Sequence, residues 1–117
     1  MLIFPLKKEW YEKIKSGEKT IEYREVKPYW TKRIGNEMHK LATFIIYEPT
    51  ELYEKISAFG YSQEFEEDFN SLLQMGYVTQ HRMNVKISKI EVVDGKNTDL
   101  KIDKPVYAIH LIDVKEV

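Results

Sequence analysis

The sequence predicts one α+β domain: a small curved sheet or barrel of about five to six short strands, with two or three flanking helices. The chain has 117 residues, a length that suits a single domain. Hydrophobic residues make up 43% of it and charged residues 32%, which is typical of a globular core. The strand-like and helix-like segments do not alternate regularly, and no glycine-rich phosphate loop follows a strand, so a doubly wound α/β fold is disfavoured. We therefore treat residues 1–117 as one domain.

The elements follow each other as strand, helix, two strands, two helical segments, long strand and final strand, over residues 2–6, 7–17, 20–25, 40–48, 49–56, 62–76, 82–95 and 105–114. Pro5 near the end of the first strand predicts an edge position or a bulge. In the first helix Trp10 and Ile14 share a face, and Gly17 suits the C-terminal cap. The next strand, KTIEYRE, alternates apolar and polar residues.

The middle of the chain is read from its prolines and its apolar runs. Pro28 forces the residue before it to extend, so residues 26–35 are expected to begin as a loop. The nearly continuous apolar run from Leu41 to Tyr47 predicts a strand, and Pro49 opens a helical turn. A longer helix is expected from Ser62 to Gly76, with an apolar stripe at helical spacing formed by Phe65, Phe69, Leu72 and Leu73.

The last third of the chain predicts a long bent strand, a polar loop and a covered strand. Apolar residues alternate from Met83 to Ile87 and then shift phase at Ile90, which indicates a bulge. The final strand is apolar on both faces, so it should lie centrally in the sheet or be covered.

Composition excludes several kinds of site. The chain has no cysteine, hence no disulfide and no thiolate-held metal, and its three histidines lack metal-ligand spacing. No metal or cofactor is expected, and a magnesium site made of carboxylates is the alternative left open. No apolar stretch approaches the roughly 20 residues that span a bilayer, and the opening MLIFPL is too short for a signal-peptide core, so we expect a cytoplasmic protein without membrane contact. The net charge of −1 neither favours nor disfavours a nucleic-acid partner. The oligomeric state is left open.

The strand KTIEYRE concentrates charge at its start. Glu22 and Arg24 fall on one face, about 7 Å apart along the strand, while Ile21 and Tyr23 fall on the other and are expected to face the core. Lys19 lies in the preceding turn and can swing over the same face as Glu22. An ordinary solvated strand face is the alternative, since an exposed Glu–Arg pair contributes only about 0–1 kcal/mol.

The residues from Gly17 to Arg24 match the pattern GxKxxExR, and in this the chain resembles the ASCH domain family of the PUA-like superfamily. The resemblance extends from the first strand through the helix before the pattern, to about Trp30. It implies a small PUA-like β-barrel with a cleft beside the signature turn. It also implies binding of RNA or of a modified nucleoside or nucleotide, as in small stand-alone or phage-type members.

One bacterial group that resembles this chain at the turn is an amidohydrolase removing acyl groups from cytidine derivatives. Its key catalytic lysine corresponds to Lys19, which makes Lys19 and Glu22 the candidate catalytic residues of this chain; nuclease activity is the other catalytic option. That group carries a threonine in place of Glu22. A further glutamate of those enzymes has no aligned counterpart here, with Glu64, Glu66 and Glu67 as loose candidates.

The chemistry of these side chains favours binding. Arg24 offers a planar fork for a phosphate or a base edge, and Glu22 can accept from an exocyclic amine. Lys19 would be a nucleophile only with a lowered pKa, and a neighbouring Glu22 would act the other way unless Glu22 pairs mainly with Arg24. The sequence leaves the two pairings open.

Basic and aromatic residues interleave just after this strand. Between positions 24 and 33 four cations face one anion, Glu25, a local balance of +3. Such segments suit single-stranded nucleic acid, although Trp30 could equally plug one end of the barrel and the charges could be solvated. The expected ligand-binding residues are Gly17, Lys19, Glu22, Arg24, Tyr29, Trp30, Lys32 and Arg33.

The segment from Glu51 to Asp68 has the opposite charge, with a balance of −5. It would repel nucleic acid, so any RNA must bind on another side of the domain. A solvated helix face is the ordinary interpretation of this segment. A protein-interaction domain that uses the acidic helix is the remaining hypothesis.

Overall fold

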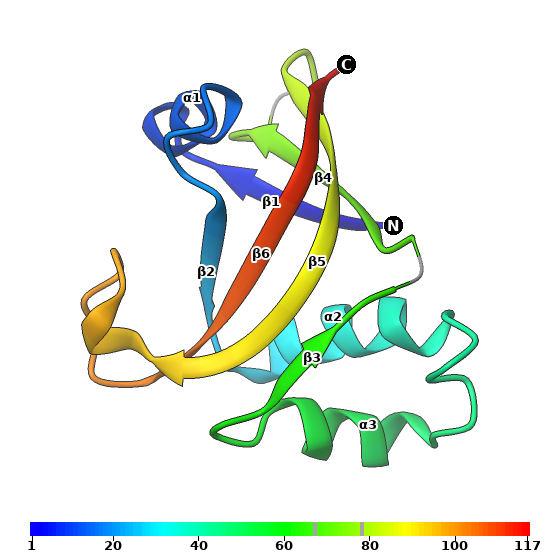
Figure 1. Ribbon diagram of the computed structural model, residues 1–117. Coiled ribbons are helices and arrows are strands. Elements are labelled where there is room, and N and C mark those ends of the chain that lie inside the picture. The colour runs from blue at the N-terminus through cyan, green and yellow to red at the C-terminus, as the bar shows by residue number, and fades with distance from the viewer. Residues whose placement is uncertain (67, 78) are drawn as a thin grey trace.

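A computed structural model describes residues 1–66, 68–77 and 79–117, which form three α-helices and one sheet of six strands (Figure 1). The helices are α1 Lys8–Lys15, α2 Pro28–His39 and α3 Pro49–Ile56. The strands are β1 Leu2–Leu6, β2 Ile21–Glu25, β3 Ser62–Glu64, β4 Asn70–Met75, β5 Arg82–Asp94 and β6 Pro105–Glu116. The α+β class with a curved sheet is as predicted.

The sheet curls into a half-barrel in the order β1-β4-β5-β6-β2, with β3 paired to β5 outside this path. The β1–β4 pair is parallel and the remaining pairs are antiparallel. Figure 1 shows β5 and β6 as a long bent ribbon, with α1 near one end of the curl and α2 and α3 near the other. β1 and β2 stand at the two ends of the strand order, and Pro5 lies on an edge strand as predicted.

Two register irregularities bend the long strand pair. They fall between Asn84 and Lys86 and between Ile87 and Lys89, and the second coincides with the predicted phase shift. A bulge adds one residue to one strand and increases the local twist, which lets a short sheet curl. β6 lies between β5 and β2, and its residues from Val106 to Ile109 are buried, so the prediction of a central last strand is confirmed.

Pro28 starts a helix rather than a loop. Lys27 is extended, with φ −149° and ψ 161°, as a residue before proline should be. Proline itself suits the first helical position, because its missing N–H has no intrahelical partner there. The expectation that residues 26–35 begin as a loop holds for residues 26 and 27, but no helix was predicted after them: the same proline that forces extension before it begins α2.

The apolar run from Leu41 to Tyr47 is not a strand. The N–H groups of Phe44 and Ile45 both donate to the carbonyl of Leu41, at 2.9 and 3.1 Å, so the chain continues in tight turns from α2 toward α3. Phe44 is buried, whereas Ile45 and Ile46 are 60% and 81% exposed. Periodicity cannot distinguish a short apolar run in a strand from one in turns, and here the strand prediction failed.

The predicted helix over residues 62–76 is replaced by β3 and β4. Phe69, Ser71 and Leu73 are all buried, with the period of two that a strand requires. β4 pairs with β1 on one side and β5 on the other, so its position is fixed by distant segments. Gly76, expected to end a helix, has φ +59° and turns the chain after β4. Glu67, within the same prediction, lies outside the described residues.

The helices predicted at residues 7–17 and 49–56 are confirmed as α1 and α3. α1 packs against β1, β4 and β6, whereas α2 packs against β1 and α3. α1 ends in a turn where Gly17 has φ +84°, a left-handed conformation that a glycine adopts without strain. One continuous core joins strands and helices, and its largest fully buried side chains are Tyr11, Tyr107, Phe4, Ile14, Ile34, Met38, Leu52, Ile56, Leu73, Met83, Ile87 and Ile90.

The loop between β5 and β6 is held close to its own start by Gly95. A Cβ at this position would lie 2.6 and 2.7 Å from the carbonyl oxygens of Ile102 and Lys104, so the loop would have to shift. We expect Gly95→Ala to lower the free energy of unfolding by about 1–3 kcal/mol in urea denaturation. Lys96→Ala, an exposed neighbour in the same turn, should change it by about 0.5 kcal/mol or less. Equal effects of the two substitutions would contradict this packing argument.

Candidate functional site

A pocket of about 360 Å³ opens between the end of β1, the strand β2, the starts of α1 and α2, and the β5–β6 loop. Its size lies within the range of small-molecule sites in proteins. The lining residues are Pro5, Leu6, Lys7, Trp10, Lys19, Glu22, Tyr23, Arg24, Glu25, Lys27, Trp30, Asp99 and Leu100. Lys19, Glu22 and Arg24, which the sequence grouped in one turn and strand, all line it.

The polar face of β2 is the buried one. Glu22 is 6% exposed, whereas Ile21 and Tyr23 are only half-buried. The expectation that Ile21 and Tyr23 face the core was therefore wrong, and the two faces of the strand are exchanged. Alternation along a strand identifies which residues share a face but not which face is inward; here pairing with β6 on one edge decides it.

Glu22 is a buried carboxylate with one unused oxygen. Its Oε1 accepts a hydrogen bond from the backbone N–H of Tyr23 at 2.9 Å. Its Oε2 lies 3.8 Å from Nη2 of Arg24 and has no hydrogen-bond partner among the described residues. Burial raises the pKa of Glu22 above its usual value, while the charges of Arg24 and Lys19 act in the opposite direction.

Arg24 lies beside Glu22 and is fixed on three sides. Its Nη2 donates to the carbonyl of Pro5 at 2.7 Å, which ties β2 to β1 across the pocket. Its guanidinium carbon lies 4.9 Å from the ring centre of Trp30 and 5.4 Å from that of Phe4. Its buried Nε has no partner among the described residues. Burial lowers the pKa of Arg24, and the Glu22 carboxylate opposes that shift.

Lys19 pairs with a residue that the sequence did not single out. Its Nζ forms an ion pair with Asp99, a residue of the β5–β6 loop, and lies 5.0 Å from the ring centres of both Trp10 and Tyr23. The Lys19 side chain is 10% exposed. This cage of one carboxylate and two rings holds a positive charge at the edge of the pocket. The polar loop gave no signal of a partner for Lys19, because Asp99 is 80 residues away in sequence.

The basic and aromatic segment after β2 divides into a pocket part and a surface part. Trp30 lines the pocket and stacks on Phe4, with ring centres 5.2 Å apart. Tyr29 is 50% exposed and carries the guanidinium of Arg33 at 3.5 Å from its ring centre. Tyr29, Arg33 and the exposed Lys32 are not among the residues that line the pocket.

Lys7 and Lys27 are part of the pocket lining, whereas Gly17 is not. Gly17 is not part of its lining, and its left-handed turn instead sets the path from α1 to Lys19. Lys7 and Lys27, at the starts of α1 and α2, do line the pocket and are exposed. Lysines next to helix starts are unremarkable in a sequence, so Lys7 gave no signal before the fold was known.

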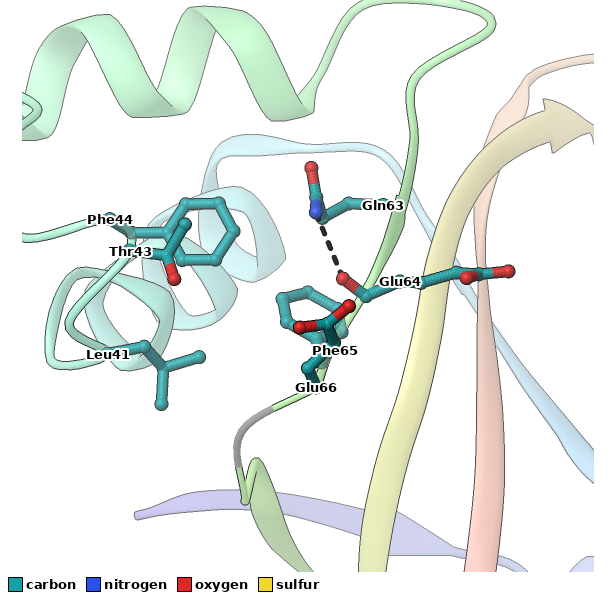
Figure 2. A pocket seen from close by; sticks show the side chains of 7 residues that line it. All are labelled: Leu41, Thr43, Phe44, Gln63, Glu64, Phe65 and Glu66. Atoms are coloured by element: carbon teal, nitrogen blue, oxygen red, sulfur yellow. Dashed lines mark hydrogen bonds between the residues drawn. The ribbon is translucent and has the colours of Figure 1, made fainter.

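The acidic residues lie elsewhere and do not form one helix. Glu51 and Glu54 are on α3, whereas Glu64 is on β3. Glu64 and Glu66 line a separate pocket of about 320 Å³, shown in Figure 2 with Leu41, Thr43, Phe44, Gln63 and Phe65. In it the side-chain amide of Gln63 donates to the backbone carbonyl of Glu64 at 2.9 Å. Neither of these two glutamates lines the pocket of Lys19, and Glu67 is outside the described residues.

No group of three or more histidine, cysteine, aspartate or glutamate side chains in residues 1–66, 68–77 and 79–117 is arranged to hold a metal ion. No helix in the same ranges is long and apolar enough to cross a bilayer.

Comparisons of the chain with protein-family models, with curated proteins and with solved structures give no match.

The buried carboxyl of Glu22 predicts a dependence of stability on pH. Because folding raises its pKa above 4.5, the native chain keeps a proton at pH values where the unfolded chain has lost it. Glu22 therefore makes unfolding easier as pH rises from about 4.5 through the native pKa. Glutamine does not titrate, so Glu22→Gln should lose less stability than the unmodified protein as pH increases over this range. The difference in free energy of unfolding between the two proteins, measured by urea denaturation at a series of pH values, should therefore shift in favour of the variant.

The exposed Glu18 is the matched control for this effect. Its side chain is in water in the folded chain, so Glu18→Gln should change the free energy of unfolding by a small and nearly constant amount over the same pH range. If Glu22→Gln also showed a constant difference, the burial of this carboxyl would not control its titration.

Proposed function

We propose that this protein binds a single nucleotide unit, either free or within single-stranded RNA, in the pocket beside β2. The observation that carries the proposal is a pair of buried atoms without hydrogen-bond partners, on two side chains that line the pocket. Oε2 of Glu22 is an acceptor and Nε of Arg24 is a donor, and neither has a partner among the described residues. Buried polar groups are rarely left unsatisfied, so each such atom calls for an explanation, and a ligand supplies one.

The rest of the pocket wall suits a nucleobase. Glu22 can accept from an exocyclic amine, as carboxylates do from the amino group of cytosine. Arg24 can donate to a carbonyl oxygen or ring nitrogen of the same base edge. Trp10, which is only half-buried, contributes aromatic surface to the lining, on which a base can stack. A cationic rim formed by Lys7, Lys19 and Lys27 favours a ligand with negative charge.

The resemblance to the ASCH signature supports the same proposal. Lys19, Glu22 and Arg24 are three of its fixed positions, and all three line the pocket. We propose that the chain is a small ASCH-type domain, with this pocket as the cleft that the resemblance implies. The same pocket, lined by Lys19, Glu22 and Arg24, then supports both the family assignment and the ligand class.

Binding is expected to depend on the Nε donor and planar fork of Arg24. Arg24→Lys keeps one positive charge but removes both features, so affinity for a bound nucleoside should fall about tenfold or more. Both tryptophans of the chain line the pocket, so tryptophan fluorescence reports binding directly. Single-stranded RNA oligomers and the four nucleosides, titrated at low salt, are the probes.

Arg33→Lys is the matched control, because Arg33 lies on Tyr29 outside the pocket. It should leave the affinity unchanged. Affinity for RNA should also fall with rising salt, as phosphate contacts release counterions. If neither RNA nor any nucleoside binds at low salt, the proposed function is abandoned.

A hydrolase acting on acylated cytidines or on RNA is the second candidate, favoured by the presence of Lys19 and the buried Glu22 on one pocket. The ion pair between Lys19 and Asp99 supports a binding role for Lys19 instead. Lys19→Arg separates the two: it keeps the charge that can pair with Asp99 but cannot act as an amine nucleophile. We expect Lys19→Arg to retain nucleoside binding. Turnover of acyl-cytidines by the unmodified protein, lost in Lys19→Arg, would establish the hydrolase instead.

A further inference from the structure

The second pocket, of about 320 Å³, has aromatic walls on two sides. One wall is the turn after α2, which contributes Leu41 and Phe44, and the other is the end of β3 with Phe65 (Figure 2). The rings of Phe44 and Phe65 lie 5.8 Å apart, centre to centre, at an interplanar angle of 46°. The volume is at the low end for ligand pockets in proteins, so this pocket suits a single side chain rather than a large ligand.

Both walls are held in place by the fold. Phe44 is buried, and its N–H donates to the carbonyl of Leu41 at 2.9 Å. The N–H of Phe65 donates to the carbonyl of Ser88 on β5 at 3.0 Å, and its ring packs edge-to-face on Phe69, with ring centres 4.9 Å apart. Rings that are already fixed bind a ligand at a lower cost in conformational entropy than rings that must be ordered on binding.

The charge at this pocket is negative and unbalanced. Glu66 is exposed at its rim, and no cationic side chain lines the pocket among the described residues. The lysines on neighbouring segments are paired elsewhere: Lys40 with Glu37 at 3.1 Å, and Lys89 with Glu91 at 3.3 Å. Aromatic faces attract cations, and a carboxylate beside them adds a charged acceptor. The ligand that fits is therefore a cation on an apolar stem.

The surface next to this pocket suits a partner polypeptide. Ile45 and Ile46 follow Phe44 in the same turn, and both are exposed. Neighbouring exposed isoleucines offer apolar contact to residues that flank the cation. α3 adds the exposed carboxylates of Glu51 and Glu54, which attract a basic segment by charge complementarity.

We propose that this pocket binds an arginine side chain from a basic segment of a partner protein, with the guanidinium against the rings of Phe44 and Phe65 and paired with Glu66. A guanidinium is planar and weakly hydrated and stacks on aromatic faces, whereas a lysine ammonium is compact and strongly hydrated. The site is independent of the proposed function, because the two pockets share no lining residue.

The test is an NMR titration at low salt with a short blocked peptide that has one arginine between two leucines. The comparison peptide carries citrulline in place of arginine, which keeps the shape and removes the charge. The arginine peptide should shift the backbone amide signals of Phe44, Phe65 and Glu66, and bind about tenfold more tightly than the citrulline peptide. Tryptophan fluorescence should stay unchanged, because both tryptophans line the other pocket.

Glu66→Gln should weaken binding of the arginine peptide about threefold or more, the size expected for an exposed ion pair. Glu64→Gln is the matched control, because it removes the same charge from an exposed side chain whose carboxylate points away from the turn after α2 (Figure 2). It should leave the affinity nearly unchanged.

Three outcomes would overturn the arginine site. Equal affinities for the two peptides, or amide shifts confined to other parts of the chain, would exclude a guanidinium in this pocket. Equal losses in Glu64→Gln and Glu66→Gln would show a general attraction to acidic surface instead. Self-association of the protein that Glu66→Gln abolishes would assign the pocket to a second copy of this chain. None of these results bears on nucleotide binding, which the titrations of the pocket beside β2 test separately.

Discussion

The buried pair of Glu22 and Arg24 on the inner face of β2 is the constraint around which the site is built. Each buried ion costs several kcal/mol of desolvation, which close pairing and further hydrogen bonds must offset. Here the offset is partial: the pair is 3.8 Å apart, the Pro5 carbonyl and the Tyr23 N–H satisfy one atom on each side chain, and two buried atoms remain unused. A pair selected for stability alone would close these gaps. The arrangement instead gives up stability and keeps a donor and an acceptor available.

The position of this pair depends on contacts from several elements. β1 supplies the carbonyl that binds Arg24, and Trp30 on α2 supplies a ring for the same guanidinium. The β5–β6 loop supplies Asp99, which holds Lys19 over the rings of Trp10 and Tyr23. Most of these groups lie on strands and helix starts, whose positions are fixed by the packing of the sheet and helices. That part of the pocket wall is therefore formed before a ligand binds. A preformed wall of this kind lowers the ordering cost of ligand binding.

The sequence predicted the elements whose signals are local and missed those decided by distant pairing. The capping glycine of α1, the alternation of β2 and the phase shift in β5 were sufficient, and the curved sheet followed from them. The spacing of Phe65, Phe69 and Leu73 fits a helix and a strand equally well, and pairing of β4 with both β1 and β5 decides between them. In the site, the turn from Gly17 to Arg24 grouped side chains that do line one pocket. Asp99 could not be found from the sequence, because its contact with Lys19 exists only after the sheet has curled.

The strand order also determines when this wall can form during synthesis. β2 is complete at residue 25, yet its partner strand β6 begins only at residue 105, and in the native register Glu22 lies opposite Ile109. A strand without its partner leaves N–H and carbonyl groups unpaired, and closing so long a loop is slow compared with forming a helix. The charged segment of β2 therefore stays solvated until residues 105–116 of β6 have been synthesised. Solvated charges at that stage disfavour premature edge-to-edge association of strands. Glu22 and Arg24, whose burial costs stability in the folded protein, thus reduce the tendency of the incomplete chain to aggregate.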